Sequence, residues 1–139
     1  MIGRLNHVGI ATPSIDDAIR LYRDTLGATD IGPKFKMAEQ GVWVCFVNVS
    51  NSQIELIEPV DENSPITKFL KSNPLGGQHH ICFEVDDLLA ARDEMAAKGA
   101  RILGEPRIGA HGTPIIFVHP KDMGGVLIEL MQSPGTAAH

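Results

Sequence analysis

The sequence predicts an α+β fold in which two paired βαβββ modules form one curved mixed sheet around a metal site. Two observations lead to this prediction. The chain repeats itself at an offset of about 73 residues, and histidine and glutamate recur at matching places in the two copies. A repeated supersecondary unit of this length is too small to bury a core alone, so two copies are expected to pair.

The repeat is clearest at the first strand of each copy. Residues 5–12 read Leu-Asn-His-Val-Gly-Ile-Ala-Thr and residues 78–85 read Gln-His-His-Ile-Cys-Phe-Glu-Val, so that His7 aligns with His80. The last strands match as well: residues 52–57 align with 126–131, so that Glu55 aligns with Glu129 at an offset of 74. Alternation of apolar and polar residues indicates strands in both places.

A helix follows the first strand of each copy. In the first, Ser14 is the expected N-cap and Gly27 the expected stop. In the second, Asp86 is the expected cap and Gly99 the stop. The apolar positions expected to face the sheet are Ile15, Ala18, Ile19, Tyr22 and Leu26 in the first helix and Leu89, Ala90, Met95 and Ala96 in the second.

Three more strands are expected in each copy, near residues 28–37, 41–49 and 52–58 and near 100–108, 113–119 and 125–132. Ser64 as N-cap and Pro65 as the first helical residue predict a short linker helix between the copies. The chain is therefore interpreted as one domain over residues 1–139. Its parts are module one at about 4–60, a linker at about 61–76 and module two at about 77–133.

Composition narrows the functional class. A net charge of −5 with scattered basic residues argues against nucleic-acid binding, and no apolar run has the length of a membrane span. Without a secretory signal the expected location is cytoplasmic. Cys45 and Cys82 lie in apolar runs without CxxC spacing, and we interpret them as reduced packing residues.

Strand parity separates candidate ligands from packing residues. Val8 and Ile10, like Ile81 and Phe83, form the apolar faces that should meet the helices, so His7 and His80 face the other way. His79 has the opposite parity, which favours His80 as the functional histidine. Glu55 and Glu129 interrupt apolar strands and are either outward-facing polar positions or buried ligands. Recurrence in both copies favours a divalent-metal site with open positions for substrate.

These residues resemble the vicinal-oxygen-chelate, or glyoxalase-like, superfamily, and over nearly the whole chain they resemble its methylmalonyl-CoA epimerase family. The most specific match is the His-Pro-Lys-Asp segment at 119–122, which leads into Gly-Gly-Val-Leu-Ile-Glu at 124–129. Further matching segments are residues 5–8, 61–66, 77–81 and 108–112.

The resemblance implies an isomerase that interconverts the (R) and (S) forms of methylmalonyl-CoA, with methylmalonyl-CoA as substrate and a homodimer as assembly. It implies His7, His80 and Glu129 as metal ligands and Glu55, which is Gln in some members, as a fourth. The ion could be cobalt, manganese, magnesium, zinc or nickel. One departure is Val44, which stands where some members carry a glutamate proposed to act as acid and base.

The expected chemistry is removal and return of the proton on the carbon between thioester and carboxylate, through a metal-stabilised enolate. We hypothesise that Glu55 and Glu129 are the two proton carriers, one for each face of the enolate. His111, in a Gly-rich stretch, either gates the substrate or lies in a plain hairpin. His119 and Lys121 either bind the substrate carboxylate or the CoA phosphates, or form a structural turn.

Two alternatives stay open. One is a lactoylglutathione-lyase-like isomerase or another metal-dependent enzyme of the same superfamily, because two histidines and a glutamate also suit an iron site. The other is a metal-free binding protein built on the same modules.

Overall fold

The structure, a computed structural model, describes residues 1–137 and divides into two compact units. The first-repeat unit comprises His7–His79, and the second-repeat unit comprises Met1–Asn6 together with the chain from His80 onward. The chain crosses from one unit to the other within strand β1 (Ile2–Ala11) and again within strand β5 (Gly77–Val85). The expected single domain over residues 1–139 stays a prediction.

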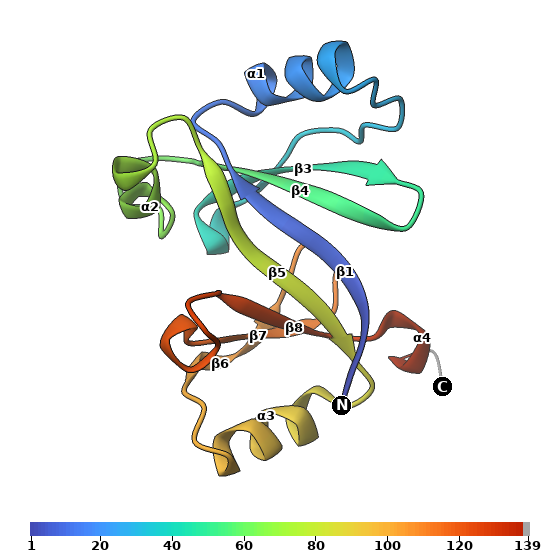
Figure 1. Cartoon of the computed structure of the whole chain (residues 1–139), viewed down its shortest axis with the longest axis vertical. Coiled ribbons are helices and arrows are strands. Elements are labelled where there is room, and N and C mark those ends of the chain that lie inside the picture. Colours follow the sequence, from blue (N-terminus) through green and yellow to red (C-terminus); the bar gives the residue numbers. More distant parts are fainter. Residues whose placement is uncertain (138–139) are drawn as a thin grey trace. The chain divides into compact units, whose positions relative to one another are not determined.

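The two repeats share a core of one strand, one helix and three further strands (Figure 1). After β1, the first repeat contains α1 (Ile15–Arg20), the π-helical turn η1 (Leu21–Thr25), β2 (Phe35–Met37), η2 (Ala38–Gln40), β3 (Val42–Val49), β4 (Ser52–Pro59) and α2 (Thr67–Ser72). After β5, the second contains α3 (Leu88–Ala97), β6 (Ile102–Ile108), β7 (Pro114–Val118), η3 (Pro120–Asp122), β8 (Ile128–Gln132) and α4 (Pro134–Ala137). The predicted α+β class with two βαβββ modules is confirmed.

The strands pair in the same way in both repeats. The order is β2-β3-β4-β1 in the first and β5-β8-β7-β6 in the second, within a sheet ordered β2-β3-β4-β1-β5-β8-β7-β6. The first strand of each repeat pairs in parallel with the last (β1 with β4, β5 with β8), and the remaining pairs within each repeat are antiparallel. The sheet is therefore mixed, as predicted.

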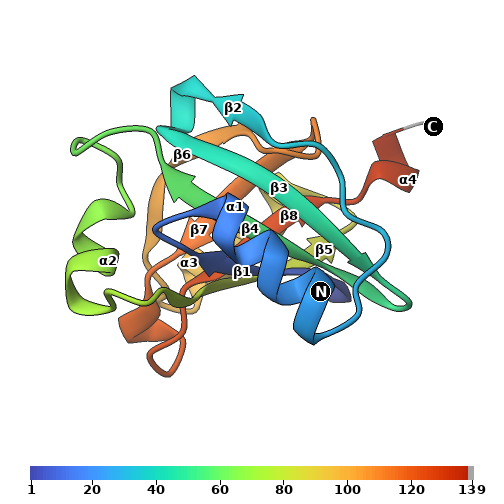
Figure 2. The same ribbon diagram turned by 90° about the horizontal axis from the view of Figure 1, so that it is seen from above.

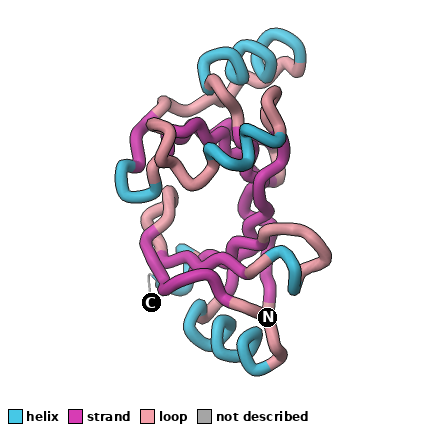
Figure 3. Tube along the Cα trace, turned by 90° about the vertical axis from the view of Figure 1, so that its left-hand side faces the viewer, coloured by secondary structure: helices cyan, strands magenta, loops and turns pink. Residues whose placement is uncertain are grey.

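One helix in each repeat covers one face of its own strands. α1 contacts β3 and β4, and α3 contacts β7 and β8 (Figures 1 and 2). Figure 3, coloured by secondary structure, shows both helices against the strands of their own units. The first core contains Ile15, Ala18, Cys45, Val47 and Leu56, and the second contains Val85, Leu88, Ala91, Ile116, Val118, Ile128 and Leu130. Ile10, Ile81 and Phe83 pack against these cores, which confirms the predicted apolar faces at these three positions.

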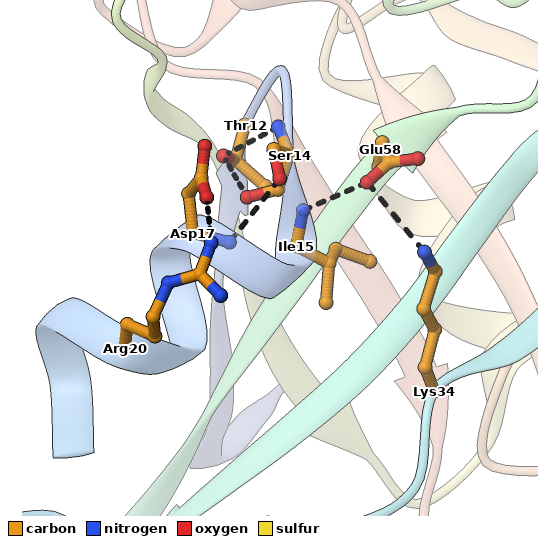
Figure 4. A network of polar contacts seen from close by, with 7 residues as sticks. All are labelled: Thr12, Ser14, Ile15, Asp17, Arg20, Lys34 and Glu58. Atoms are coloured by element: carbon orange, nitrogen blue, oxygen red, sulfur yellow. Dashed lines mark hydrogen bonds and ion pairs between the residues drawn. The ribbon is translucent and has the colours of Figure 1, made fainter.

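The start of each helix is tied to the last strand of its repeat. The Ser14 side chain accepts a hydrogen bond from the backbone N–H of Asp17, as the N-cap prediction requires. A carboxylate oxygen of Glu58 accepts from the N–H of Ile15 at 2.7 Å, and Lys34 Nζ lies 3.8 Å from the same oxygen (Figure 4). Thr12 adds a hydrogen bond to the N–H of Ser14. The repeat preserves this link, because Gln132 Oε1 accepts from the N–H of Leu88 at 2.9 Å.

Two predicted helix registers are wrong. The second helix is capped by Asp87 rather than Asp86, because the Asp87 carboxylate accepts from the N–H of Ala90. This shift of one residue leaves Leu89 exposed and buries Leu88 instead. In the first helix Leu26 is 70% exposed, because the turn that precedes it closes through a hydrogen bond from Leu26 N–H to the Leu21 carbonyl. A π-helical turn takes in one more residue and rotates the following side chain out of the apolar stripe.

Three predicted boundaries are also corrected. The strand expected at 28–37 is reduced to β2 and an isolated bridge between Ile31 and Val47, since Pro33 has no N–H to donate to a ladder. The last strand begins at Ile128 rather than 125, because Gly124 and Gly125 form a turn with positive φ values of 66° and 90°. In the linker, α2 begins at Thr67 and Ser64 is not its N-cap. Ser64 forms a preceding turn through its carbonyl, which accepts from the N–H of Thr67.

Candidate metal and proton-transfer site

The strand faces turned away from α1 and α3 carry the predicted polar residues. In the first repeat His7 and Glu55 are both buried, with 0% and 7% of their surface exposed. In the second, His80 and Glu129 are buried to a similar degree, at 4% and 5% exposed. A buried carboxylate is costly unless a partner compensates it, so the neighbours of each glutamate are informative.

In the first-repeat unit Glu55 lies beside His7. The His7 Nε2 and Glu55 Oε2 atoms are 3.8 Å apart. Phe46, which is directly opposite Glu55 across the β3–β4 ladder, presents its ring edge-on to His7 with the centroids 6.5 Å apart. On β1, Gly9 is the residue in register with Glu55. We call His7, Phe46 and Glu55 the first half-site.

The second-repeat unit contains the equivalent arrangement with a closer ion pair. His80 Nε2 lies 3.1 Å from Glu129 Oε1. Phe117 is opposite Glu129 on the β7–β8 ladder, and its ring lies edge-on to His80 at 5.7 Å. Cys82 takes the place of Gly9 in register with Glu129. We call His80, Phe117 and Glu129 the second half-site.

The choice between the adjacent histidines has a structural basis. His79 points to the other face of β5, where its ring packs edge-on against Phe69 of α2 at a centroid distance of 5.2 Å. His80 is the histidine that lies beside a carboxylate.

The donor atoms of the two half-sites fit a divalent ion. Each offers an imidazole nitrogen and a carboxylate oxygen, which together suit borderline-to-hard divalent metals. His7, Glu55 and Glu129 are among the candidate metal ligands of the described residues, and so is His111, which was predicted to gate the substrate. A carboxylate beside an imidazole can also accept and return a proton, so the same groups are suited to acid–base chemistry.

The His-Pro-Lys-Asp segment has a clear structural role. His119 Nδ1 accepts a hydrogen bond from the backbone N–H of Lys121, which caps η3. Asp122 receives both the Arg101 side chain, with Nε at 2.8 Å, and the Arg101 backbone N–H at 3.0 Å. The side-chain hydrogen bond from Arg101, followed by the backbone one, lowers the pKa of Asp122 from 3.8 to about 2. The segment thereby fixes the start of β6 against η3.

The remaining predicted residues are not members of the two half-sites. Lys121 is exposed in η3, and His111 is half-buried between β6 and β7, where the Gly112 N–H donates to the Gly109 carbonyl. Cys45 and Cys82 are buried and form no disulfide, as predicted, and burial raises the pKa of the Cys45 thiol. Val44 is 1% exposed and shares strand parity with Phe46, so an apolar side chain fills the position where some relatives carry glutamate.

Sequence reasoning missed two features of the second-repeat unit. Glu84 is buried on the same face of β5 as His80 and accepts hydrogen bonds from Asn6 at 2.9 Å and Ser133 at 3.4 Å. Strand parity indicates that Glu84 shares a face with His80, but not that it is buried or hydrogen-bonded. Arg107 on β6 places its guanidinium 5.4 Å from the centre of the Phe117 ring. No motif singled it out, because it stands in an otherwise ordinary strand.

Comparison with known proteins defines the class. The model of the Glyoxalase/Bleomycin resistance protein/Dioxygenase superfamily matches residues 6–117. An ethylmalonyl-CoA/methylmalonyl-CoA epimerase of Cereibacter sphaeroides is 54% identical, over 95% of this chain and 99% of that protein. The chain belongs to that superfamily and, within it, to the methylmalonyl-CoA epimerase family, which confirms the resemblance found in the sequence.

Solved structures agree with this assignment. The crystal structure of methylmalonyl-CoA epimerase from Mycobacterium tuberculosis has a TM-score of 0.87 and 38% identity, covering 99% of this chain and 93% of that one. A methylmalonyl-CoA epimerase in complex with methylmalonyl-CoA and NH4+ has a TM-score of 0.88 and 36% identity, covering 98% of both chains. Among the described residues, no helix has both the length and the apolar character needed to cross a bilayer.

Proposed function

We propose that this chain is an isomerase that interconverts the (R) and (S) forms of methylmalonyl-CoA. The observation that carries the proposal is the 54% identity to an ethylmalonyl-CoA/methylmalonyl-CoA epimerase over 99% of that protein's length. The two buried His–Glu pairs add the chemical groups that the reaction requires. The same comparison favours the epimerase over the lactoylglutathione-lyase-like alternative.

The reaction breaks and re-forms one C–H bond. A base removes the proton from the carbon between the thioester and the carboxylate, and the negative charge moves to the thioester oxygen to give a planar enolate. Return of a proton to the opposite face inverts the centre. No net oxidation occurs, so neither a redox cofactor nor an organic cofactor is required.

The divalent ion has its proposed ligands in both half-sites. His7, His80 and Glu129, with Glu55 as a fourth ligand, would hold it, and imidazole with carboxylate accepts cobalt, manganese, magnesium, zinc or nickel. That one ion takes ligands from both half-sites is proposed from the sequence repeat and the family. When bound, such an ion neutralises negative charge on the thioester oxygen.

Glu55 and Glu129 are the proposed proton carriers. Each is a buried carboxylate beside an imidazole, and inversion through a planar enolate is simplest with one carrier on either face. In this proposal one glutamate removes the proton and the other returns it. Val44 cannot take part, because its side chain is apolar.

Three further residues are proposed to contact the substrate at its periphery. Lys121 is exposed and offers a cation to a carboxylate or a phosphate. His119 retains its Nε2 atom for such a contact, since Nδ1 is used in capping η3. His111 is proposed to gate entry. The protein is proposed to act in the cytoplasm as a homodimer.

A coupled assay tests the function. The purified protein, with its metal content measured, is added to methylmalonyl-CoA mutase and the epimer that the mutase does not accept. We expect succinyl-CoA to form only when the protein is present. No product with the native protein or after addition of cobalt, manganese or magnesium would contradict the proposal and leave the other metal-dependent activities of the superfamily ahead.

A further inference from the structure

Arg107 is a cation on the face of the second-repeat unit that carries His80 and Glu129. On the β6–β7 ladder it is in register with Ile115, which packs with Cys82 and Met131 on the face turned away from α3. Its guanidinium lies 5.4 Å from the centre of the Phe117 ring. The Phe117 ring in turn contacts the His80 ring, with the two ring centroids 5.7 Å apart. Arg107 is therefore one aromatic ring away from a proposed metal ligand.

The other arginines of this unit have carboxylate partners. Arg4 lies 3.6 Å from Glu84, Arg92 lies 3.1 Å from Asp93, and Arg101 lies 2.8 Å from Asp122. Within residues 1–137 Arg107 forms no ion pair, and its side chain is exposed. The aromatic contact orients the guanidinium while its N–H donors stay available to an anion.

The first repeat has an uncharged residue at the position equivalent to Arg107. Phe35 is the equivalent of Arg107 in the first repeat, because it is in register with Val44 just as Arg107 is in register with Ile115. Phe35 packs against Phe46 with the ring centroids 6.0 Å apart. In the first repeat, two aromatic rings therefore occupy the positions that Arg107 and Phe117 occupy in the second. The second repeat thus carries the positively charged Arg107 where the first repeat carries the Phe35 ring.

We propose that Arg107 binds a phosphate group of the coenzyme A portion of the substrate. This inference rests on the proposed function and locates part of that function's ligand. Two anions of the substrate could meet a guanidinium: the carboxylate next to the reacting carbon and the phosphates of the nucleotide portion. The exposure of Arg107 favours the phosphates, because the carboxylate must lie near the buried His80 and Glu129. Arginine is well suited to phosphate, which it binds with two parallel hydrogen bonds.

Substitution of Arg107 by glutamine, measured with two thioesters, tests the proposal. Methylmalonyl-CoA carries both the carboxylate and the phosphates, whereas methylmalonyl-pantetheine carries only the carboxylate. For Arg107→Gln we expect KM for the CoA ester to rise roughly ten-fold with kcat unchanged, and both constants for the pantetheine ester to stay at wild-type values. An unchanged KM for both esters would overturn the proposal, and an equal rise for both would assign Arg107 to the carboxylate instead.

Binding of free CoA separates this inference from the epimerase proposal. Calorimetry with CoA needs no turnover, and CoA has phosphates but no malonyl carboxylate. We expect Arg107→Gln to weaken CoA binding roughly ten-fold and Arg107→Lys to recover part of it, since lysine keeps the charge but not the paired hydrogen bonds. Arg92→Gln on α3 is the matched control, because it removes the same charge from the opposite face of the sheet. Equal CoA affinity in wild type and Arg107→Gln would overturn the inference even if the epimerase activity were established.

Discussion

The two half-sites are built on the same scaffold but are chemically unequal. In both, a histidine on the first strand, a glutamate on the last strand and a phenylalanine opposite that glutamate occupy matching positions. The His–Glu distance, however, is 3.8 Å in the first half-site and 3.1 Å in the second. Only the second is within hydrogen-bonding distance, so His80 and Glu129 form the more closely coupled pair.

The surroundings of the pairs differ as well. Cys82 in the second repeat replaces Gly9 in the first, and the charged Arg107 replaces Phe35. The two repeats therefore match in strand register, but the residues at matching positions around the His–Glu pairs differ in chemistry. In the proposed two-carboxylate reaction each half-site supplies one proton carrier, whereas the nucleotide end of the substrate needs to be bound by one half only.

The largest effect is expected from Glu129→Gln. This change removes a proposed metal ligand and a proposed proton carrier together, so kcat should fall by about a thousand-fold or more. Metal content, measured on the purified variant by elemental analysis, should fall as well. A variant that keeps both its metal and its turnover would show that the closer pair is only structural.

A smaller effect, on stability, is expected from the Arg101–Asp122 pair of the second-repeat unit. Asp122→Asn removes the carboxylate that Arg101 holds, and the melting temperature at pH 7 should fall by a few degrees. Because folding lowers the pKa of Asp122 to about 2, its stabilisation is complete above the unfolded value of 3.8 and is lost as the pH falls through about 2.

The melting temperatures of wild type and Asp122→Asn should therefore converge between about pH 5 and pH 2. Thermal unfolding followed by circular dichroism across this range provides the measurement. A difference that persists unchanged at pH 2 would mean that the ionised carboxylate is not the stabilising group.

The smallest effect is expected from Glu58→Gln at the start of α1 (Figure 4). Gln132 already fulfils the same role in the second repeat, so an amide oxygen should replace the carboxylate with a change below about 0.5 kcal/mol. Glu58→Ala leaves the N–H of Ile15 without its acceptor and should cost about 1–2 kcal/mol. Urea denaturation of both variants, with Gln132→Ala as the matched change, measures these differences, and equal losses for Glu58→Gln and Glu58→Ala would refute the equivalence of the two links.

Periodicity was enough to predict the repeat, the faces of the strands and the choice of His80 over His79, because these follow from backbone geometry and burial. It failed where a single hydrogen bond decides the register. Asp87 rather than Asp86 caps α3, and one additional residue in the turn before Leu26 exposes that side chain.

Arg107 illustrates a different limit of sequence reasoning. Its relation to Phe117 depends on the alignment of β6 with β7, which contains a register shift between Leu103 and Arg107. Strand periodicity alone could not give that alignment. The substrate was predicted from the family resemblance, because strand patterns carry no information about it. The inequality of the half-sites depends on His–Glu distances, which only the structure gives.

The most direct test of the two-carboxylate account is proton exchange by Glu55→Gln with a single epimer of methylmalonyl-CoA in D2O. Wild type should epimerise the substrate and place deuterium on the reacting carbon. The account predicts that Glu55→Gln keeps its metal, loses epimerisation by about a hundred-fold or more, and still exchanges the α-proton of one epimer through Glu129. Epimerisation by Glu55→Gln at the wild-type rate would contradict it.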